Sequence, residues 1–177
     1  MRIISGKYRG RNIIPPKGFR ARPTTDYARE SLFNIIENRF DISSLDVLDL
    51  FSGTGSITYE FLSRDALSAE FVELNRFNYR YIASVISDLG LSNVSGFNTD
   101  VRIYLRKCNR KFDIIFADPP YDLPWLGSIP DMIREAGILK PEGTFILEHS
   151  SAFSFAGRSG FSEHRHYGNV NFSFFSF

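Results

Sequence analysis

From residue 45 onward, short apolar runs alternate with longer segments of helical spacing, and this alternation restricts the fold more than any other feature. The apolar runs predict strands at 45–51, 68–73, 94–97, 112–117 and 144–148. The segments between them predict helices at about 55–64, 75–89, 101–107 and 126–136. Gly90 is expected to end the second of these helices. Such alternation is typical of a mostly parallel sheet that helices cover on both faces.

The two ends of the chain follow different patterns. Residues 162–167 and 170–177 alternate around Gly168-Asn169, which predicts an antiparallel hairpin. Residues 1–24 predict a short N-terminal β-hairpin and loop, with strand pieces at 3–4 and 12–14, and Thr24 or Thr25 is expected to cap a helix over 26–39. The prediction is therefore an α/β, Rossmann-like sheet, mostly parallel with an antiparallel C-terminal hairpin, in one domain over 1–177.

Basic residues gather at the start of the chain. Residues 1–22 hold seven Lys or Arg and no Asp or Glu, and the net charge is +6 over 1–39 but −5 over 40–177. This distribution favours contact with nucleic-acid phosphates, although a solvated basic face would give the same pattern. The candidates for nucleic-acid contact are Arg2, Lys7, Arg9, Arg11, Arg20 and Arg22.

A glycine-containing turn follows the first predicted strand of the alternating region. Gly53 and Gly55 let the backbone turn sharply and approach a ligand closely. The turn lacks the third glycine of a dinucleotide fingerprint and the Lys-Ser/Thr of a phosphate-binding loop. We therefore expect a cofactor without pyrophosphate, for which Asp49 can bind an ammonium group and Phe51 lies in the same turn. A tight strand–helix connection without a ligand is the structural alternative.

Acidic residues follow the next two predicted strands. Glu73 comes eighteen residues after Gly55, where a carboxylate can accept hydrogen bonds from both hydroxyls of a ribose. Asp100 can accept an amino proton of an adenine ring, but an Asp at this place is also an ordinary N-cap for the helix over 101–107.

The sequence Asp118-Pro119-Pro120-Tyr121 follows the fourth strand of the alternating region. An exocyclic amine is a poor nucleophile because its lone pair is delocalised into the ring. Two acceptors on its hydrogens, here the Asp118 carboxylate and the Pro119 carbonyl, favour the tetrahedral nitrogen that methyl transfer needs. Tyr121 offers a face on which a base can stack. Either Asp118 or solvent can take the released proton.

The glycine turn together with Asp-Pro-Pro-Tyr resembles the signature of class I S-adenosylmethionine-dependent amino-methyltransferases. Three further segments closely resemble the bacterial RsmD family of 16S ribosomal RNA guanine-N2 methyltransferases. They are Met1-Arg2-Ile3-Ile4-Ser5-Gly6-Lys7-Tyr8-Arg9-Gly10-Arg11, Arg22-Pro23-Thr24-Thr25-Asp26 and Arg29-Glu30-Ser31-Leu32-Phe33-Asn34. The similarity extends from Met1 to about Tyr167-Gly168.

The resemblance implies a class I methyltransferase that uses S-adenosylmethionine, releases S-adenosylhomocysteine and methylates one guanine of small-subunit ribosomal RNA. It places Asp118, Pro119 and Tyr121 at the base and the basic hairpin on the RNA. It places Arg22 to Thr25 beside the cofactor and active site. The predicted cofactor residues are Asp49, Phe51, Gly53, Gly55, Glu73, Asp100 and Thr25.

Other functions stay open on the sequence alone. Related Pro-Pro-Tyr loops, more often opened by Asn than by Asp, serve methylation of adenine N6 in DNA and of glutamine in proteins. A non-catalytic RNA-binding or assembly protein with the same fold is a third hypothesis. The exact nucleotide, and the choice between free 16S RNA and a 30S or assembly particle, are not determined by the sequence.

The remaining composition limits the setting. The single cysteine, Cys108, allows no intrachain disulfide, which is typical of the cytoplasm. No run reaches the ~18 apolar residues of a membrane span. The three histidines have no metal-ligand spacing, so no metal is expected. A chain of this size is expected to be a monomer.

Overall fold

The computed structural model describes residues 1–16, 19 and 25–177. Its seven-stranded sheet has the order β3-β2-β1-β4-β5-β7-β6. The strands are β1 (Asp46–Leu50), β2 (Ser68–Val72), β3 (Val94–Phe97), β4 (Phe112–Ala117), β5 (Leu139–His149), β6 (Phe161–Tyr167) and β7 (Val170–Phe175). β1 to β5 are parallel, and β7 is antiparallel to both β5 and β6. The predicted fold class and C-terminal hairpin are confirmed.

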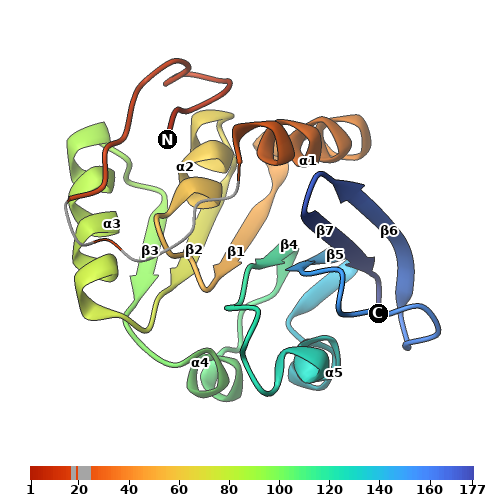
Figure 1. The fold of residues 1–177 in the computed structure, drawn as a ribbon. Helices are drawn as coiled ribbons and strands as arrows, with labels where there is room; N and C mark the ends of the chain where they lie inside the picture. Colours follow the sequence, from red (N-terminus) through yellow and green to blue (C-terminus); the bar gives the residue numbers. More distant parts are fainter. Residues whose placement is uncertain (17–18, 20–24) are drawn as a thin grey trace.

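Helices cover both faces of the sheet (Figure 1). They are α1 (Asp26–Arg39), α2 (Ser56–Ser63), α3 (Arg76–Leu89), α4 (Val101–Lys107) and α5 (Ile129–Ala136), with 3-10 turns η1 (Ile42–Ser44) and η2 (Leu126–Ser128). Val47 and Ile146 pack with α1 and α2, whereas Leu48 and Leu147 pack with α4 and α5. Because side chains along a strand alternate between the two faces of the sheet, neighbouring residues pack against opposite layers of helices.

The fifth parallel strand is longer than its apolar run. The sequence predicts a strand over 144–148, but β5 extends over Leu139–His149 and includes Pro141 and Gly143. A register shift between Phe112 and Ile114 and a positive φ at Glu142 accommodate the irregular segment. Turn-forming residues therefore lie inside a bulged strand. The helix predicted over 126–136 likewise begins as η2 before α5.

The N-terminal hairpin has less strand structure than the sequence predicts. Only one β-bridge, between Arg2 and Asn12, forms within the described part of this segment. The backbone N–H groups of Ile4 and Ser5 donate instead to the carboxylate of Glu60 on α2. A buried side chain of the neighbouring helix thus takes the hydrogen bonds that a longer ladder would use.

This hairpin is packed onto the body of the molecule rather than projecting from it. Ile3 and Ile13 are buried in one cluster with residues of β2, α2 and α3. The Tyr8 hydroxyl donates to the carbonyl of Leu89 at the end of α3, and Ser63 accepts from the N–H of Tyr8. The basic side chains of the segment are therefore carried on a docked surface.

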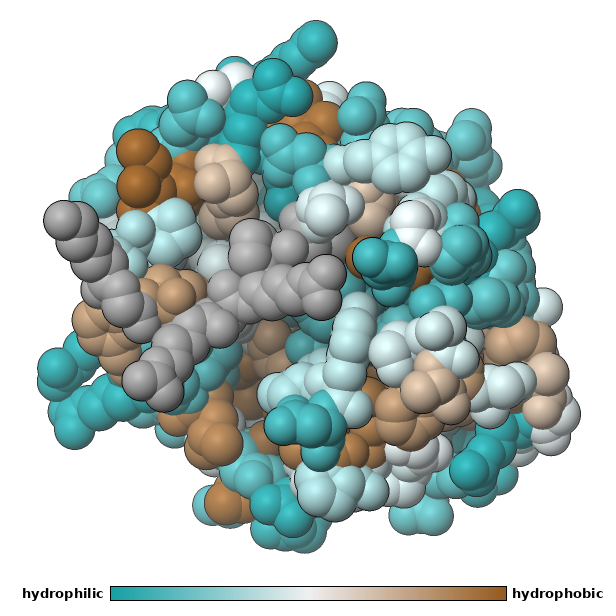
Figure 2. All heavy atoms as spheres, viewed as in Figure 1, coloured by the Kyte–Doolittle hydropathy of each residue, from teal (hydrophilic) through white to brown (hydrophobic). Residues whose placement is uncertain are grey.

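In the view of Figure 2, hydrophilic residues cover much of the surface and hydrophobic residues lie between them. Large exposed apolar residues, such as Ile14, Leu67 and Phe77, belong to different segments of the chain. In the described ranges, no helix has both the length and the apolar character needed to cross a membrane.

Candidate active site

The carboxyl ends of β1 and β4 lie side by side where the strand order reverses. The chain runs from β1 outward to β3 and then returns to β4 on the other side of β1. In sheets of this kind, ligands bind at the carboxyl ends of the strands next to such a reversal. The Asp118 N–H donates to the Leu50 carbonyl at 3.4 Å, which joins the two strand ends. The glycine turn and the Asp-Pro-Pro-Tyr loop therefore share this edge.

The turn after β1 has a backbone that favours glycine. Gly53 and Gly55 have φ values of +53° and +79°. A Cβ built on Gly55 would lie 2.6 Å from the ring and hydroxyl of Tyr59, closer than Cβ atoms approach other atoms. The turn after β1 therefore packs tightly against the first turn of α2, and it has no side chain at Gly55.

Asp49 is a buried acid beneath this turn. Asp49 is only 2% exposed. Its Oδ2 accepts hydrogen bonds from the Thr58 N–H at 3.2 Å and from the Thr58 hydroxyl at 2.6 Å. Burial raises the pKa of Asp49 to about 7, although the hydrogen bonds from Thr58 oppose that effect. A cationic partner would stabilise the ionised form of this buried carboxyl group, because the cation compensates for the solvation lost on burial.

Glu73 connects the glycine turn to the start of α3. Its Oε2 accepts from the Gly53 N–H at 2.8 Å, and its Oε1 accepts from the Asn75 N–H at 2.7 Å. Burial raises the pKa of Glu73, with the two backbone donors acting in the opposite direction. Each carboxylate oxygen has a further lone pair, so a ribose hydroxyl can still donate to it. The predicted pair of Gly53 and Glu73 is in direct contact.

Asp100 is the N-cap of α4. Its carboxylate accepts from the Arg102 N–H at 2.7 Å and binds both Nε and Nη2 of the Arg102 side chain. These hydrogen bonds lower the pKa of Asp100. Asp100 therefore serves as a helix N-cap, which was the alternative that the sequence left open. Its contact with an adenine ring stays a prediction.

Arg102 also links Asp100 to the turn after β1. Its guanidinium lies 5.0 Å from the centre of the Trp125 ring, and Trp125 lies 5.8 Å from the Phe51 ring. Phe51 has a φ of +60°, which is unfavourable for a residue with a side chain. The predicted residues Phe51 and Asp100 thus belong to one continuous group of contacts.

The Asp-Pro-Pro-Tyr loop is held against β5. The Tyr121 hydroxyl donates to Glu148 Oε1 at 3.2 Å, and Glu148 is only 3% exposed. Asp118 is half-buried and Pro119 is buried. The loop follows β4 directly, so its first two residues lie next to the ends of β1 and β5. It therefore presents Asp118 and Pro119 at the edge that carries the glycine turn.

The remaining predicted residues lie on the N-terminal part of the chain. Thr25 is the N-cap of α1 and accepts from the Ala28 N–H at 3.2 Å. The four described basic candidates, Arg2, Lys7, Arg9 and Arg11, are all exposed. Arg20 and Arg22 lie outside the described residues.

Sequence reasoning missed several residues that shape the site. Thr58 binds Asp49, Glu148 binds Tyr121, and Arg102 and Trp125 connect Asp100 to Phe51. Trp125 is the single tryptophan of the chain, which was the one available signal. The others are common residue types at unremarkable positions, so only the fold reveals their partners.

The fold and this edge define a class I methyltransferase. Its seven-stranded sheet ends in an antiparallel hairpin, and an acid near the end of β1 and another directly after β2 lie beside a glycine turn. The chain belongs to the RsmD family: the family model described as "Conserved hypothetical protein 95" matches residues 1–176. The resemblance inferred from the sequence is confirmed.

Individual relatives agree with this assignment. The chain is 32% identical to a "Ribosomal RNA small subunit methyltransferase D" of Buchnera aphidicola, covering 87% of this chain and 78% of the relative. It is 31% identical to the protein of the same name from Escherichia coli, covering 84% and 74%. A solved structure titled "Putative methyltransferase yhhF from Escherichia coli" superposes with a TM-score of 0.86 at 28% identity, covering 99% of this chain and 96% of that chain.

Proposed function

We propose that the protein transfers a methyl group from S-adenosylmethionine to the exocyclic N2 of a guanine in small-subunit (16S) ribosomal RNA. The observation that carries this proposal is the placement of Asp118-Pro119-Pro120-Tyr121 beside the glycine turn, joined through the Asp118 N–H and Leu50 carbonyl. The relatives named ribosomal RNA small subunit methyltransferase D support the same substrate.

The residues at the strand ends suit S-adenosylmethionine. Asp49 is a buried acid suited to the ammonium group of the cofactor, and Glu73 is a buried acceptor suited to its ribose hydroxyls. The absence of a Cβ at Gly55, where one would meet Tyr59, lets the turn stay tight under the cofactor. Asp100 would accept from the adenine amino group, and Phe51 and Thr25 would border the site. When bound, the cofactor supplies an electrophilic methyl group on a sulfonium.

The protein's part in the reaction is to position the acceptor nitrogen. The Asp118 carboxylate and the Pro119 carbonyl accept the two hydrogens of the guanine amino group, which favours a tetrahedral nitrogen with its lone pair available for bonding. Tyr121 stacks on the flipped base, and Glu148 fixes its hydroxyl. Transfer would break the bond between the methyl carbon and the sulfonium sulfur, release S-adenosylhomocysteine and form the new C–N bond. The nitrogen would become cationic, and one proton would leave to Asp118 or to solvent.

The whole chain acts in this proposal as one methyltransferase domain. Residues 1–24 form its RNA-contacting extension, in which Arg2, Lys7, Arg9, Arg11, Arg20 and Arg22 bind phosphates. The protein is proposed to act as a monomer. The enzyme works in the cytoplasm on 16S RNA, either free or within a 30S or assembly particle.

Parallel transfer from labelled S-adenosylmethionine to RNA, DNA and protein tests the choice of acceptor. The proposal predicts label in 16S ribosomal RNA from cells that lack the modification. Label in DNA adenine or in protein glutamine, with none in RNA, would replace the proposed substrate. Failure to bind the cofactor would instead favour a non-catalytic RNA-binding protein.

A further inference from the structure

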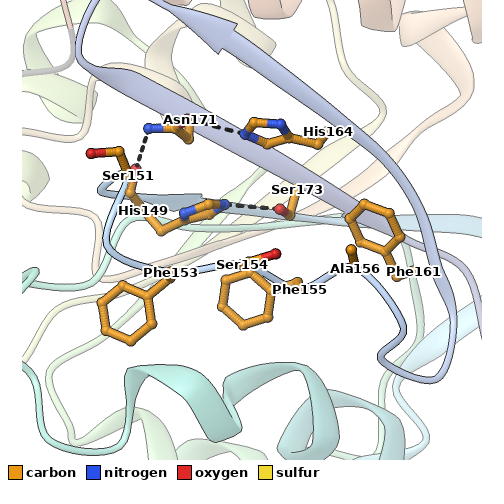
Figure 3. A pocket seen from close by; sticks show the side chains of 10 residues that line it. All are labelled: His149, Ser151, Phe153, Ser154, Phe155, Ala156, Phe161, His164, Asn171 and Ser173. Atoms are coloured by element: carbon orange, nitrogen blue, oxygen red, sulfur yellow. Dashed lines mark hydrogen bonds between the residues drawn. The ribbon is translucent and has the colours of Figure 1, made fainter.

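A cavity of about 290 Å³ lies at the carboxyl end of β5, and none of the proposed catalytic or cofactor residues lines it. In Figure 3, polar side chains of β5, β6 and β7 lie on one side, and Phe153, Ser154 and Phe155 of the loop after β5 lie on the other. Of these segments, only β5 also contributes a residue, Glu148, to the methyl-transfer site.

One side of the cavity is a row of polar side chains that crosses three strands. His149 on β5 is paired in register with Asn171 on β7, and Ser173 on β7 is paired with His164 on β6. His149, Asn171 and Ser173 are only 1%, 4% and 1% exposed. Burying polar groups on a sheet face costs free energy unless they are hydrogen-bonded. These buried polar side chains therefore need hydrogen bonds to compensate for the solvation that they lose.

The hydrogen bonds fix the orientation of the row. His149 Nδ1 lies 2.8 Å from the Ser150 carbonyl, so this nitrogen donates, and Nε2 accepts from the Ser173 hydroxyl at 2.8 Å. Burial lowers the pKa of His149, which favours this neutral form. Asn171 Oδ1 accepts from His164 Nε2 at 3.0 Å, and its amide donates to the His149 carbonyl at 3.4 Å. The polar edges are held in place before a ligand arrives.

The opposite side of the cavity is aromatic. The rings of Phe153 and Phe155 are nearly parallel, with an interplanar angle of 11° and centroids 6.3 Å apart. Phe155 also meets His149 edge-to-face at 5.0 Å, and Phe153 is the more exposed of the two phenylalanines. The cavity thus combines flat apolar surfaces with fixed hydrogen-bonding edges (Figure 3).

The cavity and the Tyr121 hydroxyl lie on opposite faces of β5. Glu148, which binds Tyr121, follows Ile146 on the face covered by α1 and α2. His149 follows Leu147 on the face covered by α4 and α5. Because successive strand side chains point to opposite faces, the cavity and the Tyr121 hydroxyl are separated by the strand itself. The cavity adjoins the proposed base site without being part of it.

We propose that the cavity binds an unpaired base of the RNA substrate, next to but distinct from the base that is methylated. Single-stranded bases are recognised by stacking on aromatic rings and by hydrogen bonds to their edges, which are the two features found here. No acidic residue is among the described residues that line the cavity, so nothing there repels a phosphate chain. This inference rests on the proposed RNA methyltransferase function.

Steady-state kinetics on unmodified 16S RNA test the effect of the cavity on substrate binding. Loss of base stacking costs on the order of tenfold in affinity. Phe153→Ala and His164→Ala should therefore raise KM for RNA about tenfold, with kcat and cofactor affinity unchanged. Leu67→Ala is the control, because Leu67 is 57% exposed and directly precedes β2, at the amino edge of the sheet. Equal KM values for all four proteins would overturn the proposal.

Ultraviolet cross-linking distinguishes failure of this inference from failure of the proposed function. The complex with 16S RNA or the 30S particle is irradiated, and the cross-linked peptides are mapped by mass spectrometry. Nucleotide attached within residues 150–160, and lost in Phe153→Ala, supports the base site even if methyl transfer is absent. Methyl transfer to RNA without such a cross-link, or a cross-link from this loop to a ribosomal protein, overturns it while the proposed function stands.

Discussion

Asp118 is the residue on which the proposed chemistry depends most. Replacing Asp118 with Ala removes one of the two acceptors for the target amine, and comparable losses of transition-state stabilisation cost about 10²–10³-fold in rate. We expect Asp118→Ala to lose transfer by at least about 100-fold while its affinity for S-adenosylmethionine, measured calorimetrically, stays the same.

Asp118→Asn is the matched variant for this prediction. It keeps an acceptor oxygen but loses the negative charge, so its rate should lie between those of the wild type and Asp118→Ala. Near-wild-type turnover in the Ala variant would contradict the assigned role. Equal rates in the wild type and the Asn variant would show that solvent takes the proton.

The proposed contact between Asp49 and the cofactor predicts that cofactor binding depends on pH. Burial raises the pKa of Asp49 to about 7, and the proposed ammonium partner would bind the ionised form. Affinity for S-adenosylmethionine should therefore rise with pH below this pKa, by up to about tenfold per pH unit, and level off above it. In Asp49→Asn the affinity should be weaker and this rise absent. A wild-type pH profile in that variant, measured by calorimetry, would exclude Asp49 as the partner.

At the residue scale, the sequence predicted the acids and glycines but not what holds them. Asp49, Glu73 and Asp118 were predicted because acids after parallel strands meet at one edge. Their orienting contacts come from residues far along the chain, such as Glu148 with Tyr121, which depend on the register of the sheet. For Asp100 the sequence could not distinguish two roles, because a helix N-cap and a contact with a ligand both need a carboxylate at this position.

At the scale of the elements, the N-terminal hairpin offers a matched pair of glycines. Gly6 and Gly10 have similar φ values, +79° and +82°. A Cβ on Gly6 would lie 1.8 Å from the Ser63 carbonyl oxygen, whereas one on Gly10 would meet no atom within 4 Å. Only Gly6 is therefore in close contact with α2.

Alanine at these two positions should have different effects on stability. Gly10→Ala should lower the free energy of unfolding by about 1 kcal/mol, the cost of the left-handed backbone. Gly6→Ala should lower it by about 2–4 kcal/mol, because overpacking against α2 is added to that cost. Denaturant unfolding measures both values. Equal losses would mean that the hairpin does not dock on α2 as described.

The elements were predictable wherever local pattern and tertiary setting agree. The boundaries of β3, α4 and β4 match the predicted ones. The extension of β5 was not predictable, because Pro141 and Gly143 have the composition of a turn. Only the pairing of Leu139 and Thr144 with β4, on either side of them, makes them part of a bulged strand. The hairpin was overestimated for a similar reason, since Glu60 competes for its N–H groups.

At the scale of the whole molecule, we expect the docked hairpin to make RNA binding dependent on salt. Each phosphate contact releases counterions, so affinity should fall steeply as salt concentration rises. Arg9→Ala and Arg11→Ala should each reduce the slope of log affinity against log salt by about 1. Arg134→Ala, on α5 across the sheet, should leave the slope unchanged. Binding that is indifferent to salt would argue against the electrostatic role of the hairpin.

The charge asymmetry could be read from the sequence, but its geometry could not. The sequence indicated a basic segment, whereas the structure shows that this segment is docked on α2 and α3 through Ser63, Glu60 and the core around Ile3. Arg29 and Arg64 both pair with the buried Glu60, so the same contacts connect the hairpin to α1 and α2. The basic surface is therefore fixed relative to the sheet edge that carries Asp118.

Nucleoside analysis of 16S RNA after reaction with labelled S-adenosylmethionine tests whether the protein methylates the N2 of guanine. Naked RNA and 30S particles that lack the modification serve as substrates, and the RNA is digested to nucleosides after the reaction. The proposed function predicts labelled N2-methylguanosine with the wild-type protein and at least about 100-fold less with Asp118→Ala. Label in any other nucleoside, or no label in RNA from a protein that binds the cofactor, would contradict it.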